Sequence, residues 1–277
     1  MAYFAYHIKQ ITLSPMRGNL KFSNFAYLNK EVEDIQVNSR AFIIYDPKSR
    51  STIVGKNEHL RFAPASTVKI MTALIAIEEY PLDKIFTAEG IGAITGSKMD
   101  LEEGEKITVE NLLYGLMLPS GNDAAYMLAQ NYPGGREQFV KRMNEKTREL
   151  KLENTHFVDP AGFENDNYTT AFNLARLASF AMEDKVFRKI VATKEKIVYD
   201  SSGKIVHELK NLNELLGING VNGIKTGFTE EAGGVLVTSV EQGGKEYIIV
   251  VLNSTDRFED TQAIIINAIK NIALMSY

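Results

Sequence analysis

Short apolar runs mark both ends of the chain, whereas the middle shows helical spacing. Residues 41–45 and 51–54 flank the turn-forming stretch 46–50, a pattern typical of a β-hairpin. Similar short runs predict further strands at residues 195–199, 204–207, 224–229, 234–240 and 247–252. Strand-forming segments from both ends therefore enclose a long middle segment.

The middle segment and the C-terminus contain apolar residues at helical spacing. The predicted helices lie at about residues 66–80, 108–118, 120–128, 135–150, 170–182 and 263–269. Thr108 and Ser120 are suitable N-terminal caps, and Pro81 and Pro119 end the helices before them. A loop rich in Asn, Asp, Gly and Pro spans residues 154–168.

This order of elements predicts an α+β fold, that is, an α/β sandwich. An antiparallel sheet built from the N- and C-terminal segments would be flanked by helices, with a helical lobe inserted at about residues 82–190. Residues 1–38 lack clear periodicity, so we expect an N-terminal extension, partly disordered or lying on the body. Residues 39–277 would then form one catalytic domain.

Composition excludes several classes of function. The 277 residues contain no cysteine, which rules out disulfides and thiolate chemistry, and the formal net charge of -4 does not favour nucleic-acid binding. The histidines are scattered, so we expect no metal site and no cofactor. No window is apolar enough to span a membrane, and the start lacks a secretory pattern. An export segment is thus either unnecessary or not present in this sequence.

The segment Pro64–Met71 carries the first candidate chemistry. Ser66 and Lys69 are three residues apart, which places both side chains on one face of a helical turn. An amine within hydrogen-bond reach can activate a serine as a nucleophile. Alone, this spacing is more typical of a capped helix with a solvated lysine.

Two further short motifs follow in the chain. Ser120-Gly-Asn122 lies in a loop before a predicted helix, and Lys225-Thr-Gly227 lies just before or within a predicted strand. Taken singly, Ser120 is an ordinary helix cap and Gly227 an ordinary bulge. The three motifs in this order are the set that characterises penicillin-binding proteins and serine β-lactamases.

The chain resembles the low-molecular-mass penicillin-binding proteins, which are serine D-alanyl-D-alanine carboxypeptidases with a β-lactamase/transpeptidase-like fold. The resemblance covers about residues 40–275 and includes the following segments: Phe42–Lys48, Pro64–Thr72, Leu118–Ala125, Gly223–Gly233 and Asp256–Phe258. It implies removal of the terminal D-alanine from peptidoglycan stem peptides, acylation by β-lactam antibiotics, and a location on the outer side of the cytoplasmic membrane.

The resemblance also implies roles for individual residues. Ser66 would be the nucleophile, and Lys69 its base, with a pKa lowered by burial and by Lys225. Ser120 would relay a proton, and Asn122 would hold Lys69 and the substrate amide. The implied substrate-binding residues are Lys225, Thr226, Gly227, Phe228 and Arg257, of which Lys225, Thr226 and Arg257 would bind the terminal carboxylate. The backbone N–H groups of Ser66 and Phe228 would bind the oxyanion.

Some features depart from the family pattern. Asp159 and Asn167 occupy positions that usually hold asparagine and histidine, so the support of the site by that histidine is an open question. The β-rich C-terminal domain and the anchoring helix of many relatives do not follow residue 277 in this sequence.

Two alternative functions remain open at this stage. A serine β-lactamase shares the nucleophile motifs, and Glu164 lies in the general region of a deacylation base, although its context differs. A non-catalytic sensor of penicillin or peptidoglycan would keep the fold and lose the reaction. The three intact motifs favour an enzyme.

Overall fold

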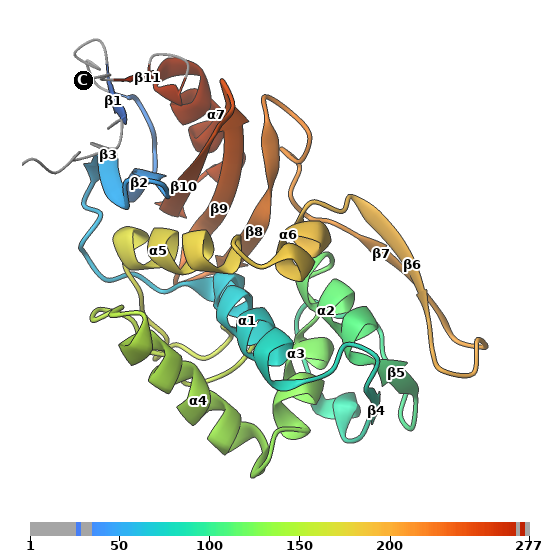
Figure 1. The fold of residues 1–277 in the computed structure, drawn as a ribbon. Helices are drawn as coiled ribbons and strands as arrows, with labels where there is room; N and C mark the ends of the chain where they lie inside the picture. Colours follow the sequence, from blue (N-terminus) through green and yellow to red (C-terminus); the bar gives the residue numbers. More distant parts are fainter. Residues whose placement is uncertain (1–25, 29–34, 270–271, 275–277) are drawn as a thin grey trace, which may run out of the picture.

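The computed structural model describes residues 26–28, 35–269 and 272–274. The strands of its central sheet are β2 (Ala41–Asp46), β3 (Ser51–Lys56), β8 (Val221–Thr229), β9 (Gly233–Gln242) and β10 (Lys245–Ser254). They form a five-stranded antiparallel sheet in the order β3-β2-β10-β9-β8. The sheet is thus built from both ends of the chain, as predicted (Figure 1).

Helices cover both faces of this sheet (Figure 1). Successive residues of a strand point to opposite faces, so neighbouring positions of β2 belong to different cores. Ile43 packs with the helical part of the molecule, including α5 (Ala171–Ala181). Ile44 packs on the other face with Ile264 of α7 (Arg257–Asn267). The predicted α+β sandwich is therefore confirmed.

Along the chain, the remaining helices come after β3 and before β8. They are α1 (Lys69–Glu79), α2 (Val109–Met117), α3 (Asn122–Gln130), α4 (Gly135–Glu149) and α6 (Lys185–Val191), with short 3₁₀ turns η1 (Ala65–Val68) and η2 (Ile91–Ala93). Helix α1 passes through the centre of this helical part, and its first eight residues are all buried. The buried face of a surface helix is a stripe, so burial on all sides marks α1 as a core helix.

The helix caps confirm part of the sequence prediction and correct another part. Thr108 caps α2 by accepting a hydrogen bond from the Asn111 N–H at 3.3 Å. The prediction that a helix starts at Ser120 is wrong, because α3 begins at Asn122 and Ser120 has a left-handed φ of 65°. A residue with this φ cannot form the first turn of a right-handed helix. Ser66 also precedes its α-helix, as part of η1.

Several short elements were not predicted. Besides η2 and α6, they are the strands β1 (Ala26–Leu28), β4 (Ile85–Thr87), β5 (Lys106–Thr108) and β11 (Ile272–Leu274). Strands of three residues are too short to show periodicity in a sequence. Most of the predicted extension, residues 1–38, lies outside the described residues, so that boundary stays a prediction. Among the described residues, no helix is long and apolar enough to cross a membrane.

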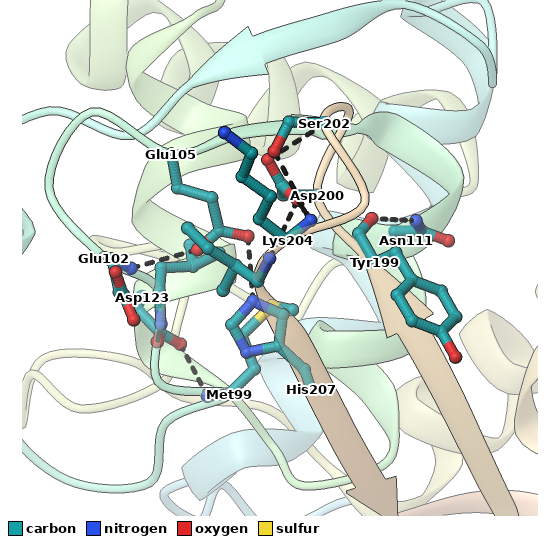
Figure 2. Close-up of polar contacts among 12 residues, drawn as sticks. Met99, Glu102, Glu105, Asn111, Asp123, Tyr199, Asp200, Ser202, Lys204 and His207 are labelled. Atoms are coloured by element: carbon teal, nitrogen blue, oxygen red, sulfur yellow. Dashed lines mark hydrogen bonds and ion pairs between the residues drawn. The ribbon is translucent and has the colours of Figure 1, made fainter.

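A hairpin of β6 (Glu195–Tyr199) and β7 (Val206–Lys210) is fastened to the helical part by a buried ion pair. His207 Nε2 lies 2.8 Å from Glu105 Oε1, and both side chains are almost fully buried (Figure 2). The neighbouring backbone N–H of Met99 donates to Asp123 Oδ1 at 3.0 Å. Because Asp123 directly follows Asn122, this network joins the hairpin to a predicted active-site residue.

The ion pair makes stability depend on pH. The hydrogen bond with Glu105 raises the pKa of His207 above 6.5 and outweighs the opposing effect of burial. Because the pKa of His207 is higher in the folded state, its protonation stabilises the fold. This stabilisation is fully present below the unfolded-state pKa of about 6.5 and is lost as the pH rises through the folded-state pKa. We predict that His207→Gln costs about 1–3 kcal/mol at pH 6 and removes this pH dependence. Denaturant unfolding at several pH values measures both effects.

Glu208→Gln is the matched control, because Glu208 is exposed on the same strand. It should change the unfolding free energy by less than about 0.5 kcal/mol. Identical pH profiles of stability for His207→Gln and the wild type would contradict this account.

Candidate active site

The Lys69 side chain stands at the centre of the predicted site and has three oxygen neighbours. Its Nζ lies 3.0 Å from Ser66 Oγ, 2.7 Å from Asn122 Oδ1 and 2.8 Å from the carbonyl oxygen of Ala161. Two of these neighbours can only accept a hydrogen bond, whereas the Ser66 hydroxyl can also donate one. A neutral Lys69 amine therefore gives its two N–H groups to the amide and the carbonyl and turns its lone pair to Ser66.

Burial makes the neutral form of Lys69 accessible. The side chain is fully buried, and desolvation lowers its pKa from 10.5 to about 7, against the opposing charges of Asp159 and Asp123. Desolvation disfavours the charged form of a lysine. The expected dry environment is therefore the cause of the shift. The expected contribution of Lys225 remains a prediction.

The loop that provides the Ala161 carbonyl is organised by one carboxylate. Asp159 is 3% exposed and accepts hydrogen bonds from the backbone N–H groups of residues 161–164, at 2.6 to 3.3 Å. Thr72 Oγ1 of α1 donates to the Pro160 carbonyl at 2.6 Å. These bonds fix the loop against the helix that carries Lys69.

Asn167 completes this loop at the position where the family pattern usually has a histidine. Its Nδ2 donates to Asp159 Oδ2 at 2.6 Å and to the Glu164 carbonyl at 2.7 Å, and its Oδ1 accepts from the Val158 N–H at 3.0 Å. The two departures from the family pattern are thus hydrogen-bonded to each other. Together they hold the loop without a histidine.

A glycine allows this loop to approach the nucleophile. Gly162 has a φ of 76°, and a Cβ atom there would lie 1.9 Å from the Ala65 carbonyl oxygen. No side chain fits at such a distance, and the left-handed conformation also favours glycine. Gly162 therefore sets the contact between the loop and the residue before Ser66.

The second motif contributes from the start of α3. Asn122 Oδ1 accepts from Lys69, while its Nδ2 donates to the Thr95 carbonyl at 2.7 Å, which fixes the orientation of the amide. Ser120 is 3% exposed, and within the described part of the chain its buried Oγ has no hydrogen-bond partner. A buried hydroxyl without a partner, on a residue in a strained conformation, is a feature that marks functional positions.

The third motif lies within β8 and is linked to α7. Lys225 is 2% exposed, and burial, followed by the charges of Lys69 and Arg257, lowers its pKa well below 10.5. Its Nζ donates to the Thr226 carbonyl at 2.9 Å. Arg257 Nε donates to Thr226 Oγ1 at 2.6 Å. The structure thus gathers two basic side chains and one hydroxyl on this side of the site.

Strand β8 lies directly against the nucleophile. A Cβ atom on Gly227 would be 2.9 Å from the Ser66 backbone nitrogen and 3.1 Å from Ala65 Cβ. Any side chain at position 227 would force the strand away from η1. Phe228 follows at the exposed end of the strand, with 62% of its surface accessible.

Comparisons with known proteins agree with this geometry. The profile of the family described as D-alanyl-D-alanine carboxypeptidase, peptidase S11, matches residues 28–256. The chain belongs to this family. It is 33% identical to the carboxypeptidase DacF of Bacillus subtilis over 82% of this chain and 60% of that protein. It is 38% identical to the D-alanyl-D-alanine carboxypeptidase of Streptomyces sp. (strain K15), over 74% and 77% of the two chains.

Solved structures of the family share the fold. The Streptomyces K15 DD-transpeptidase is similar, with a TM-score of 0.79 and 34% identity over 84% of this chain and 97% of that one. A putative penicillin-binding protein homologue from Mycobacterium tuberculosis gives a TM-score of 0.78 at 27% identity, over 84% and 91%. The resemblance inferred from the motifs is therefore confirmed.

Sequence reasoning missed the residues that act through the backbone. The Ala161 carbonyl and the Thr95 carbonyl carry no side-chain signal, and Gly162 was not singled out. The stretch Asp-Pro-Ala-Gly at residues 159–162 did contain a usable signal, because aspartate before such a turn commonly accepts backbone hydrogen bonds. It pointed to an organised loop but not to its contact with Lys69.

We predict that Asp159→Ala lowers the unfolding free energy by about 2–4 kcal/mol, because several buried N–H groups lose their acceptor. It should also lower the pKa of Lys69 further, since the Asp159 charge raises it. Chemical denaturation measures the first effect. Asp166→Ala is the control, because Asp166 is exposed in the same loop. Equal losses in the two variants would contradict the assigned role of Asp159.

Proposed function

We propose that this chain is a serine D,D-carboxypeptidase that removes the terminal D-alanine from peptidoglycan stem peptides through an acyl-enzyme. The observation that carries this proposal is the contact between Ser66 Oγ and a buried Lys69 amine whose pKa is about 7. Family membership and the names of its relatives support the choice of substrate.

In the acylation step, neutral Lys69 takes the proton of Ser66. The Ser66 oxygen attacks the carbonyl carbon between the two D-alanines, and negative charge develops on the carbonyl oxygen. The backbone N–H groups of Ser66 and Phe228 stabilise this oxyanion, and the loss of one such donor typically costs about 10²–10³ in rate. The C–N bond then breaks and leaves the acyl group on Ser66.

The departing D-alanine needs a proton on its amine. Ser120 passes a proton from Lys69 to this nitrogen, and in support of this role its buried hydroxyl has no hydrogen-bond partner among the described residues. Asn122 holds Lys69 in place and binds the substrate amide. Water then attacks the ester carbon, Ser66 recovers its proton, and the shortened peptide leaves.

The terminal carboxylate of the substrate binds between Lys225, Thr226 and Arg257. Without a ligand, burial keeps the pKa of Lys225 low. A bound carboxylate favours the charged form of the lysine, so binding and protonation assist each other. Gly227 lets the substrate lie as an extended strand beside β8, close to the Ser66 backbone.

The same site accounts for acylation by β-lactam antibiotics, whose strained amide takes the place of the peptide bond. The resulting penicilloyl ester on Ser66 hydrolyses slowly. The place of action is the outer side of the cytoplasmic membrane, where peptidoglycan lies. The β-lactamase alternative has less support, because the Glu164 side chain is exposed and has no hydrogen bond to Ser66 or Lys69 in the described part of the chain.

We predict that the wild type releases D-alanine from a peptide ending in Lys-D-Ala-D-Ala and forms a long-lived penicilloyl adduct. Ser66→Ala removes the nucleophile and should abolish both activities. Assays of free D-alanine and mass spectrometry of the intact protein measure these results. Ser202→Ala, at an exposed serine, is the control and should behave as the wild type.

The other outcomes separate the alternatives. Rapid turnover of penicillin by the wild type would favour a β-lactamase. Binding of penicillin or peptide without any release of D-alanine would favour a sensor. D-alanine release that persists in Ser66→Ala would contradict the assigned nucleophile.

A further inference from the structure

A cleft of about 360 Å³ lies between the end of α4, the second half of α5 and the turn that joins β2 to β3. The lining residues that matter here are Tyr45, Arg50, Lys151, Arg176 and Glu183. None of the residues assigned to catalysis or substrate binding lines this cleft. A ligand bound there would therefore not occupy the active site.

Three basic side chains line the cleft without a carboxylate partner. Arg50 and Lys151 are exposed, and neither side chain forms an ion pair or a hydrogen bond with the described residues. Arg176 Nη1 donates to the Lys151 carbonyl at 2.8 Å, and its Nη2 donates to the Leu150 carbonyl at 2.9 Å. These carbonyls hold the guanidinium in place but do not neutralise it.

The acidic residues of the cleft compensate only part of this charge. Glu149 Oε1 lies 2.7 Å from Arg142 Nη1, and its Oε2 lies 3.6 Å from Lys146 Nζ, so its charge is balanced by α4 itself. Glu183 is exposed and has no ion pair within the described ranges. Three basic groups against one unbalanced carboxylate make the cleft locally positive, although the whole chain has a formal net charge of -4.

A buried hydroxyl without a partner lies beside these charges. Tyr45 is 2% exposed, and its ring packs edge-on against Phe172, with 6.3 Å between the ring centroids. The hydroxyl makes no hydrogen bond to any residue that the structure describes. Burial raises the pKa of Tyr45, and the nearby charges of Arg176 and Arg50 oppose this shift. The hydroxyl therefore keeps its proton, and because buried polar groups are normally hydrogen-bonded, it favours an acceptor from a ligand.

We propose that this cleft binds a phosphate group carried on a small polyol such as glycerol. Arg50, Lys151 and Arg176 bind the phosphate oxygens, since guanidinium groups match phosphate geometry. The Tyr45 hydroxyl donates to one of these oxygens. Glu183 accepts a hydrogen bond from a hydroxyl of the polyol. The volume is at the lower end for small-molecule sites, which restricts the ligand to this size.

The number of donors favours phosphate over a carboxylate. A phosphate monoester carries a charge of about -1.5 to -2 at neutral pH and three acceptor oxygens, whereas a carboxylate carries one charge and two oxygens. Three basic groups and a hydroxyl match the larger set. This binding is independent of the proposed peptidase reaction, because no catalytic residue takes part in it.

The test is a titration of the full chain with glycerol phosphate at constant ionic strength, followed by proton–nitrogen correlation NMR. We expect saturable shifts of the backbone amides of Arg50 and Lys151, and none with glycerol alone. Arg50→Gln should weaken binding by about 2-fold to 5-fold, a modest effect because solvent screens an exposed charge. Tyr45→Phe removes only the hydroxyl and should weaken binding by about 3-fold to 10-fold.

Lys48→Gln and Tyr199→Phe are the matched controls. Lys48 is an exposed cation on the same turn as Arg50, Tyr199 is an exposed tyrosine of the β6–β7 hairpin, and neither lines the cleft. Both variants should bind glycerol phosphate as the wild type does. The absence of saturable shifts in the wild type would overturn the site. So would an equal loss of affinity in Lys48→Gln and Arg50→Gln, because it would reduce the effect to overall charge.

A glycerol phosphate group can belong to a soluble ester or to the headgroup of a phospholipid. Sedimentation with vesicles of phosphatidylcholine alone, or with added phosphatidylglycerol, separates these sources. Binding to the phosphatidylglycerol vesicles that is weakened by Arg50→Gln and Tyr45→Phe, but not by the control variants, would assign the site to a headgroup. Saturable binding of glycerol phosphate without such vesicle binding would assign it to a soluble ester. Failure of both ligands to bind would refute the proposal.

Discussion

The active site depends on one buried amine. The Lys69 side chain is fully buried, yet three oxygen atoms lie within hydrogen-bond distance of its amine. Two of them accept only, and the third is the Ser66 hydroxyl. Loss of solvation lowers the cost of the neutral form, and the two fixed acceptors direct its lone pair. The chemistry of the site therefore follows from burial and hydrogen-bond geometry together.

The rest of the fold provides those two acceptors and the dry environment. Helix α1 runs through the core, so its first residue cannot reach water. The loop held by Asp159 and Asn167 brings the Ala161 carbonyl to the amine, and Gly162 gives it room. The start of α3 brings Asn122 from a segment far away in the sequence. Three distant parts of the chain must therefore be in place before the lysine can act as a base.

The sequence predicted the sheet and the site motifs well, because both depend on side chains. The continuous apolar runs of β2 and β10 reflect burial on both faces of the sheet, and the three motifs carry reactive groups. The sequence-based prediction failed for features that depend on backbone conformation or on backbone atoms. Serine is a common helix cap, but Ser120 has a left-handed φ, and α3 begins only at Asn122. The role of the Ala161 carbonyl could not be predicted from the sequence either, because every residue has a backbone carbonyl.

The most direct measurement of this account is the titration of the Lys69 amine itself. Carbon or nitrogen NMR of labelled lysine, assigned by comparison with Lys69→Arg, follows that group as a function of pH. Lys69 should titrate near pH 7, because burial lowers its pKa to about 7. A transition near pH 10.4, the value of an exposed lysine, would contradict it.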